Sequence, residues 1–156
     1  MNAIALLKQE VQANIRQSPN GIHSKFVQVN EHWGLKLYNC DAMRDRCFKR
    51  QGQAAKLDVG PAVGGLIDLG EETGYYRYGY MSEKVTTVES VIEEGNDGCL
   101  DSYEVDELFD DWYDENSEEM DEVHSVLNSM NFFFSDCHVG NWGINSVGKL
   151  VCIDFG

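Results

Sequence analysis

The chain has 156 residues, with 12 Lys or Arg against 27 Asp or Glu, a formal net charge of −15 and 42% hydrophobic residues. The hydrophobic share is sufficient for a packed core, which excludes a wholly disordered chain, and the length suits one domain or two small lobes. The negative charge argues against direct binding to nucleic acid through a basic stripe.

The sequence shows no sign of a membrane or an oxidising compartment. No apolar run approaches the roughly 20 residues that span a bilayer, and the first residues lack a signal-peptide pattern. The five cysteines are scattered without C-x-x-C spacing, which indicates reduced thiols rather than zinc ligands. We therefore expect a cytoplasmic protein that does not contact a membrane.

The first half of the chain predicts one helix followed by two hairpins with a second helix between them. Apolar residues at helical spacing predict an amphipathic helix within residues 1–20. Alternating apolar residues in 23–39 and in 62–82 predict the hairpins. The segment 41–57 lacks proline and predicts a helix, which should end before Pro61.

The second half of the chain carries the excess charge. Residues 85–135 hold sixteen Asp or Glu and no Lys or Arg. Apolar residues at 108–113 predict a short amphipathic turn, and those at 120–130 predict a longer helix that Asn116 and Glu119 would start as a capping box. A short hairpin follows. An antiparallel sheet with one helix, followed by a helical part, predicts an α+β fold with two lobes.

The segment 131–156 reads NFFFSDCHVGNWGINSVGKLVCIDFG and holds the most specific pattern. Asp136 and Asn141 follow an apolar run, and a strand after the turn residues NSVG delivers Asp154. Two strands joined in this way should bring Asn141 and Asp154 together, and their amide and carboxylate oxygens suit Mg²⁺ that keeps waters and phosphates. A further carboxylate, Asp136, can accept a hydroxyl proton during phosphoryl transfer.

The pattern D-x-H-x-G-N followed by I-D-F-G resembles the catalytic and metal-binding loops of the protein-kinase-like superfamily, in its aminoglycoside phosphotransferase and choline kinase branch. The resemblance implies ATP and Mg²⁺ as cofactors, Asp136 as catalytic base, and Asn141 and Asp154 as magnesium ligands. His138 stands where the superfamily often has a residue that touches the transferred phosphate. The resemblance covers about residues 21–156 and ends at D-F-G, so we expect a truncated member that lacks the substrate-binding helices.

The same resemblance assigns roles to the first hairpin and the helix after it. Lys36 in GLKLY becomes the strand lysine that grips the α- and β-phosphates, and Gly34 on the same face leaves room for an adenine ring. The glycine-rich loop is poorly represented, and Ser24 is the residue there that could assist the phosphates. The helix 41–57 takes the place of the kinase αC helix but contains no Glu, which leaves Asp45 as the candidate partner of Lys36.

The resemblance also predicts the division of the chain. Residues 1–20, which precede the part that the resemblance covers, form the N-terminal helix predicted from apolar spacing. Residues 21–85 form a five-stranded antiparallel N-lobe with one αC-like helix and end in a hinge, in which Glu83 and Val85 would read the adenine edge. Residues 86–156 form a partial helical C-lobe with the catalytic and metal-binding loops. Mg-ATP would bind between the two lobes.

Three interpretations fit these observations, and the first two are functions of different classes. The first is a minimal phosphotransferase that moves the γ-phosphate of ATP to a hydroxyl on a protein or small molecule, with a partner or a second copy of the chain (a homodimer) as acceptor platform. The second is an inactive, pseudokinase-like protein whose acidic segment 89–122 binds a basic protein face, as would suit a phage-encoded protein in the host cytoplasm. A kinase remnant without chemistry, with the acidic segment as a solvated helical face, is the third.

Overall fold

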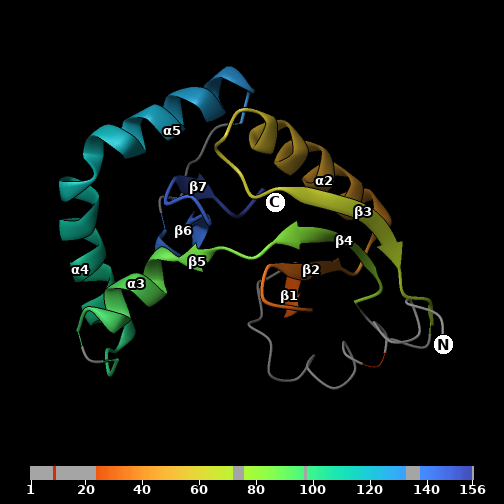
Figure 1. The fold of residues 1–156 in the computed structure, drawn as a ribbon, viewed down its shortest axis with the longest axis horizontal. Coiled ribbons are helices and arrows are strands. Elements are labelled where there is room, and N and C mark those ends of the chain that lie inside the picture. Colours follow the sequence, from red (N-terminus) through yellow and green to blue (C-terminus); the bar gives the residue numbers. More distant parts are fainter. Residues whose placement is uncertain (1–8, 10–23, 72–75, 97, 133–137, 156) are drawn as a thin grey trace. The chain divides into compact units, whose positions relative to one another are not determined.

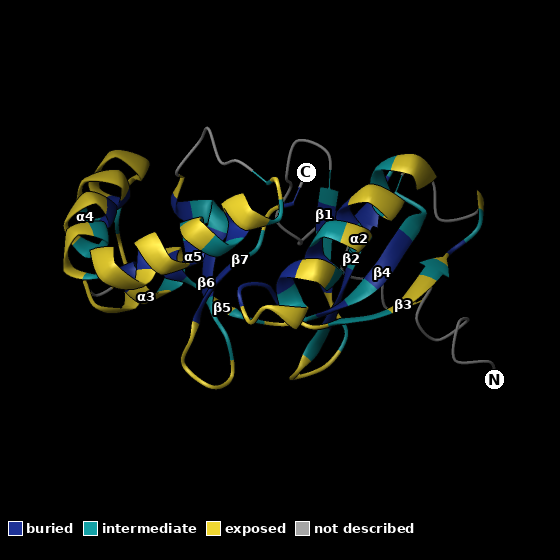
Figure 2. Cartoon of the chain, turned by 90° about the horizontal axis from the view of Figure 1, so that it is seen from above, coloured by how far each residue is buried: buried dark blue, intermediate teal, exposed yellow. Residues whose placement is uncertain are grey.

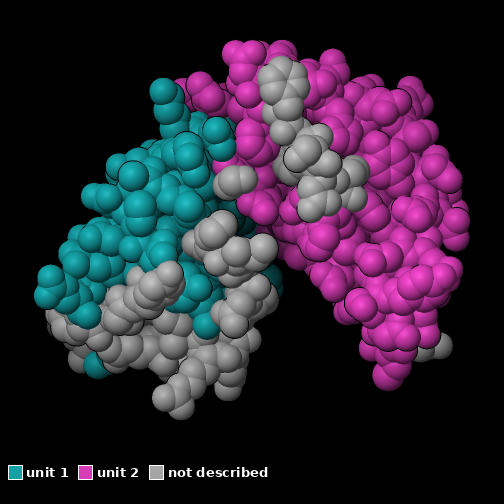
Figure 3. Space-filling view, turned by 180° about the vertical axis from the view of Figure 1, so that it is seen from behind, with its two compact units in different colours: residues 1–52, 62–84, 156 teal, residues 53–61, 85–155 magenta. Residues whose placement is uncertain are grey.

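The computed structural model describes residue 9 and residues 24–71, 76–96, 98–132 and 138–155. Within them the fold is mixed α+β, with antiparallel sheets and four α-helices (Figure 1). The helix predicted over 1–20 lies outside the described residues apart from Gln9. The chain forms two compact units, which are described separately. Unit 1 comprises residues 1–52, 62–84 and 156, and unit 2 comprises residues 53–61 and 85–155 (Figure 3).

Unit 1 contains a four-stranded antiparallel sheet with the strand order β1-β2-β4-β3. The strands are β1 (Ser24–Gln28), β2 (Trp33–Tyr38), β3 (Val63–Asp68) and β4 (Tyr78–Glu83). Both predicted hairpins are therefore confirmed. The predicted fifth strand is not found in the described residues of unit 1. The alternating pattern supplies only these four segments. Residues 10–23, before β1, lie outside the description.

The sheet of unit 1 has two faces with different coverings, since successive strand residues point to opposite sides. One face is apolar, and its buried cluster consists of Val27, Leu35, Leu37 and Leu69. The opposite face carries the alternate residues of β2, namely Gly34, Lys36 and Tyr38. Helix α2 (Asp41–Lys56) packs on this second face, where its Cys47 is buried against Tyr38 and Tyr80.

Helix α2 confirms the prediction for 41–57 and ends one residue earlier. Gly52 is accommodated without a break. The chain leaves the helix at Asp58, whose φ of 61° lies in the left-handed region that ends helices. Strand β3 is less regular, since its pairing with β4 shifts between Val63 and Leu66. A β-carbon on Gly64 would lie 2.7 Å from Met81 Cβ, so the irregular stretch requires a glycine there.

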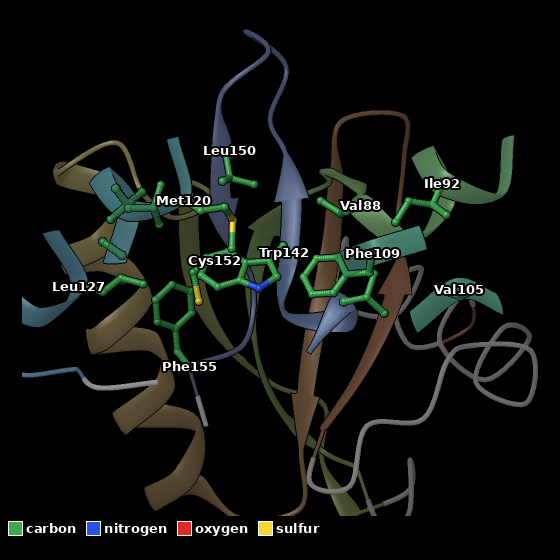
Figure 4. Packing of buried hydrophobic residues seen from close by; sticks show 14 residues of the cluster. Val88, Ile92, Val105, Phe109, Met120, Leu127, Trp142, Leu150, Cys152 and Phe155 are labelled. Carbon is green, nitrogen blue, oxygen red and sulfur yellow. The ribbon is translucent and has the colours of Figure 1, made fainter. Parts of the chain in front are cut away.

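Unit 2 contains a three-stranded antiparallel sheet and three helices. The strands, in the order β5-β6-β7, are β5 (Thr86–Thr87), β6 (Trp142–Ile144) and β7 (Leu150–Cys152). The helices are α3 (Val88–Glu94), α4 (Ser102–Glu115) and α5 (Ser117–Ser129). Trp142 lies in the middle of their shared core, with Phe109 of α4 on one side and Phe155 and Leu127 on the other (Figure 4).

The helices of unit 2 differ from the sequence prediction in three respects. Helix α3 was not predicted. Residues 102–115 form one continuous helix instead of a short turn, because Asp101 caps it by accepting a hydrogen bond from the Glu104 amide at 2.9 Å. The predicted capping box at α5 is wrong. Asn116 makes no side-chain cap bond, and the Glu119 carboxylate instead accepts from the Leu150 amide at 3.0 Å. None of the helices in the described residues is long and apolar enough to cross a membrane.

Candidate functional site

Lys36 lies in the middle of β2, between the buried residues Leu35 and Leu37, on the sheet face that α2 covers. Its ammonium group donates to Oε1 of Gln51, on the third turn of α2, at 2.9 Å. A lysine on a strand therefore meets a polar side chain from the helix that follows the strand. The amide oxygen of Gln51 therefore helps to position the ammonium group.

Gln51 is the centre of a buried polar network. Its side chain is fully buried, its amide nitrogen donates to Ser82 Oγ at 2.8 Å, and its oxygen also accepts from the Tyr80 hydroxyl at 2.8 Å. The Tyr80 hydroxyl lies 3.4 Å from that of Tyr38. Burial, reinforced by Tyr80, raises the pKa of the Tyr38 phenol, so this end of the network stays protonated and uncharged. Buried networks with satisfied members hold their side chains in one arrangement.

Asp45, the predicted partner of Lys36, has a different neighbour. Its carboxylate is exposed and accepts from Arg44 Nε at 2.6 Å. Arg44 is in turn held against the sheet, where it donates to the carbonyls of Ile67 and Gly79 at 3.2 and 3.4 Å. Asp45 therefore faces away from the buried side of α2, and Gln51 meets the lysine instead. The helical spacing of Cys47, Gln51 and Ala54 is the signal in the sequence, since it puts one polar residue on an apolar face.

Gly34 lies on the same face of β2 as Lys36, and the ring of Phe26 occupies the space beside it. A β-carbon on Gly34 would lie 2.0 Å from Cζ of Phe26 and 2.6 and 2.7 Å from its two Cε atoms. Phe26 is paired with Lys36 across β1 and β2. Ser24, at the start of β1, is half-buried and paired with Tyr38. The sequence predicts space for an adenine ring beside Gly34. In the structure this space is next to the Phe26 ring.

Of the two predicted hinge residues, Glu83 is the last residue of β4 and Val85 follows the strand. The backbone amide of Glu83 donates to the Ala62 carbonyl at 2.8 Å, and its carboxylate accepts from the Ala62 amide at 3.1 Å. Val85 is half-buried, and its Cγ2 would lie 2.6 Å from a β-carbon on Gly143. The Glu83 amide is therefore already engaged within unit 1, whereas the Val85 side chain packs within unit 2.

Asn141 and Asp154 lie at one end of the β6–β7 hairpin. Trp142 pairs with Cys152, and the Ile153 amide donates to the Asn141 carbonyl at 2.8 Å, so the ladder continues one step beyond the strands. Asp154 follows directly and is exposed, while Phe155 is buried in the core of unit 2. The hairpin therefore delivers one amide side chain and one carboxylate side chain to the same end of the sheet.

The remaining predicted residues belong to the loop before β6. Asp136 lies outside the described residues. His138 is exposed and caps the short 3₁₀ turn Val139–Asn141 by accepting from the Gly140 amide at Nδ1, at 2.9 Å. In a neutral imidazole this leaves the proton on Nε2.

No group of three or more His, Cys, Asp or Glu side chains that could hold a metal occurs in the described parts of the chain. Two surface hollows lie along α5, lined partly by Glu119 and Glu122, and Lys36 lines neither. Asn141 and Asp154 supply oxygen donors of the kind that Mg²⁺ takes, together with waters and phosphate oxygens. These two side chains alone do not complete a cation site, so a bound cation would need further oxygen ligands.

No family model and no curated protein matches the chain. Among solved structures, one that matches is the co-crystal structure of WbdD and the kinase inhibitor LY294002, at a TM-score of 0.46 and 11% sequence identity. The match covers 87% of this chain but only 31% of the WbdD chain, so this chain spans less than a third of that protein.

Proposed function

We propose that the chain is a minimal kinase-like protein that binds Mg-ATP and transfers the γ-phosphate to a hydroxyl group. The observation that carries the proposal is the hydrogen bond between Lys36 on β2 and Gln51 on α2. Protein kinases place a strand lysine against a Glu of the αC helix, and this pair positions the lysine for the phosphates of ATP. Here a strand lysine and the helix that follows it also meet, through the side-chain amide of Gln51.

The proposal assigns a chemical role to each of the predicted residues. The Lys36 ammonium would neutralise charge on the phosphates. The oxygens of Asn141 and Asp154 would hold Mg²⁺, which when bound neutralises the phosphates and orients them. In the transfer, the acceptor oxygen bonds to the γ-phosphorus, the bond from that phosphorus to the oxygen of ADP breaks, and Asp136 takes the hydroxyl proton. His138, with a proton on Nε2, can donate to the transferred group.

Binding of Mg-ATP is the first test, measured as a thermal shift and by calorimetry. We expect saturable binding that weakens at least about tenfold in Lys36→Met, which removes a positive charge that offsets phosphate, and in Asp154→Asn, which removes a carboxylate that holds Mg²⁺. Lys49→Met is the matched control, because Lys49 is an exposed lysine of α2. A folded protein without any response to millimolar Mg-ATP would refute the proposal.

Transfer is tested with radiolabelled ATP and a panel of hydroxyl acceptors, including the chain itself. Asp136→Ala should abolish transfer while Mg-ATP binding persists, since the proposed base acts on the acceptor proton and not on the nucleotide. Transfer that survives in Asp136→Ala would remove the assigned role of this residue. Binding without transfer by the wild-type chain would favour the pseudokinase alternative.

A second candidate function is the capture of a basic protein by the acidic surface, meaning the exposed carboxylates of α4 and α5. All eleven Asp and Glu of these helices are exposed, and neither helix contains Lys or Arg (Figure 2). In the described parts of the chain none of the eleven carboxylates forms an ion pair. A surface of one charge sign steers oppositely charged partners and should bind them in a salt-dependent way.

The acidic surface is tested by pull-down with the wild-type chain and with a variant whose seven α4 carboxylates are changed to amides. A partner identified by mass spectrometry should be basic, rebind in purified form, and be lost from both the variant and a 0.5 M salt wash. Capture that is equal in the variant, or insensitive to salt, would count against the acidic surface as the binding site.

A further inference from the structure

Two aromatic residues are opposed to Lys36 on its face of the unit 1 sheet, namely Tyr80 on β4, which is fully buried, and Phe26 on β1, which is half-buried. Directly opposed residues of an antiparallel pair project from the same face, and Phe26 is opposed to Lys36. Gly34, two residues before Lys36, is opposed to Gln28 and is therefore a diagonal neighbour of Phe26. The tip of the Phe26 ring nevertheless reaches Gly34, where a β-carbon would lie 2.0 Å from Cζ.

This contact shows how the Phe26 ring lies. A ring that reaches its diagonal neighbour extends along the sheet rather than standing up from it, and only a glycine at position 34 permits this. Phe26 is half-buried, whereas Gly34 beneath the ring tip is buried. The ring therefore covers Gly34 and keeps part of its own surface accessible, one strand away from an ammonium group that Gln51 holds in place.

We propose that Phe26 is the residue on which the nucleobase of the bound nucleotide stacks. This inference rests on the proposed binding of Mg-ATP and adds a residue that positions the base. Gly34 then acts indirectly. It lets the Phe26 ring lie flat on the sheet, and it does not itself contact the base. Aromatic side chains bind bases of any sequence through their π-faces, so stacking supplies affinity without base-edge hydrogen bonds. Affinity from stacking is relevant here because the amide of Glu83, a predicted hinge residue, already donates to the Ala62 carbonyl.

The test compares two probes that differ only in the nucleoside, namely Mg-ATP and Mg-tripolyphosphate. Calorimetry is performed on the wild-type chain, Phe26→Ala, Phe26→Leu and Phe26→Tyr. We expect Phe26→Ala and Phe26→Leu to bind Mg-ATP about tenfold more weakly, as loss of one stacked base predicts, and Phe26→Tyr to remain within about twofold of wild type. Binding of Mg-tripolyphosphate should be unchanged in all three variants, which also shows that unit 1 is still folded.

The outcomes separate this inference from the proposed function. Equal Mg-ATP affinity in wild type, Phe26→Ala and Phe26→Leu would overturn base stacking while leaving nucleotide binding intact. Tighter Mg-ATP binding in Phe26→Ala would also overturn it, since the ring would then obstruct the base. A parallel loss of both probes in Phe26→Ala would mean that the ring serves the phosphate site or the fold. If the wild-type chain bound neither probe, the proposed function and the stacking role would fall together.

Discussion

The ring of Phe26 occupies the place that a side chain at Gly34 would need, at 2.0 Å from Cζ to the ideal β-carbon. A methyl group cannot be accommodated at this distance, so Gly34→Ala must push the ring away from the sheet. We expect Gly34→Ala to lower the free energy of unfolding by about 1–3 kcal/mol, the usual cost of overpacking. Urea denaturation measures this cost without any ligand.

A double-mutant cycle separates the ring from other causes. In a Phe26→Ala background the obstacle is gone, so Gly34→Ala should cost far less there, with a coupling energy of about 1 kcal/mol or more. Gly65→Ala, on β3 of the same sheet, is the matched control, because its β-carbon would meet nothing within 4 Å. Equal costs of Gly34→Ala in both backgrounds would show that the ring is not the cause.

Gln51 should contribute more to stability than any exposed residue of α2. Gln51→Leu keeps the volume but removes the partner of Ser82, Tyr80 and Lys36 at once. Because buried polar groups without partners are costly, we expect a loss of about 2–4 kcal/mol in the free energy of unfolding. Gln53→Leu, an exposed position on the same helix, should change it by less than about 0.5 kcal/mol. Similar losses in both variants would contradict the network.

Tyr38 makes the stability of the fold depend on pH in alkaline solution. Burial raises the pKa of its phenol above the ordinary value of about 10, so above that pH the unfolded chain loses a proton that the folded chain retains. Stability contributed by Tyr38 is therefore complete below about pH 10 and falls as pH rises, by about 1 kcal/mol per pH unit. Urea denaturation from pH 8 to 11 should show a shallower fall in Tyr38→Phe. Identical slopes would contradict this.

Much of unit 1 could be predicted because its local patterns agree with its tertiary packing. Alternation placed Leu35 and Leu37 on the apolar face and left Lys36 on the other, and the structure confirms this arrangement. The hairpin that ends in Asp154 was also predictable, since Asn145 and Gly148 provide the turn. In such segments the side-chain period alone decides which residues share a face.

The partners of the candidate site residues could not be predicted in the same way. Asp45 was chosen by its charge, but helical geometry turns it towards Arg44 and turns the uncharged Gln51 towards Lys36. The ring of Phe26 over Gly34 depends on a diagonal contact between two strands, which no single-strand pattern encodes. Helix α3 was missed because seven residues are too short for a clear period, although Thr87 caps it by accepting from the Ser90 amide.

The acidic surface should destabilise unit 2 in a way that depends on position along α4. Asp114 and Glu115 lie in the last turn, where the helix dipole disfavours negative charge and no basic residue is present. We expect Asp114→Asn with Glu115→Gln to raise the melting temperature at about 0.01 M salt, and the gain to shrink at about 0.5 M salt as screening increases. Glu104→Gln, in the first turn of the same helix, is the matched control and should lower it instead, because carboxylates stabilise helix N-termini. Calorimetric scans in which both variants shift in the same direction would show that net charge, and not its placement on α4, governs stability.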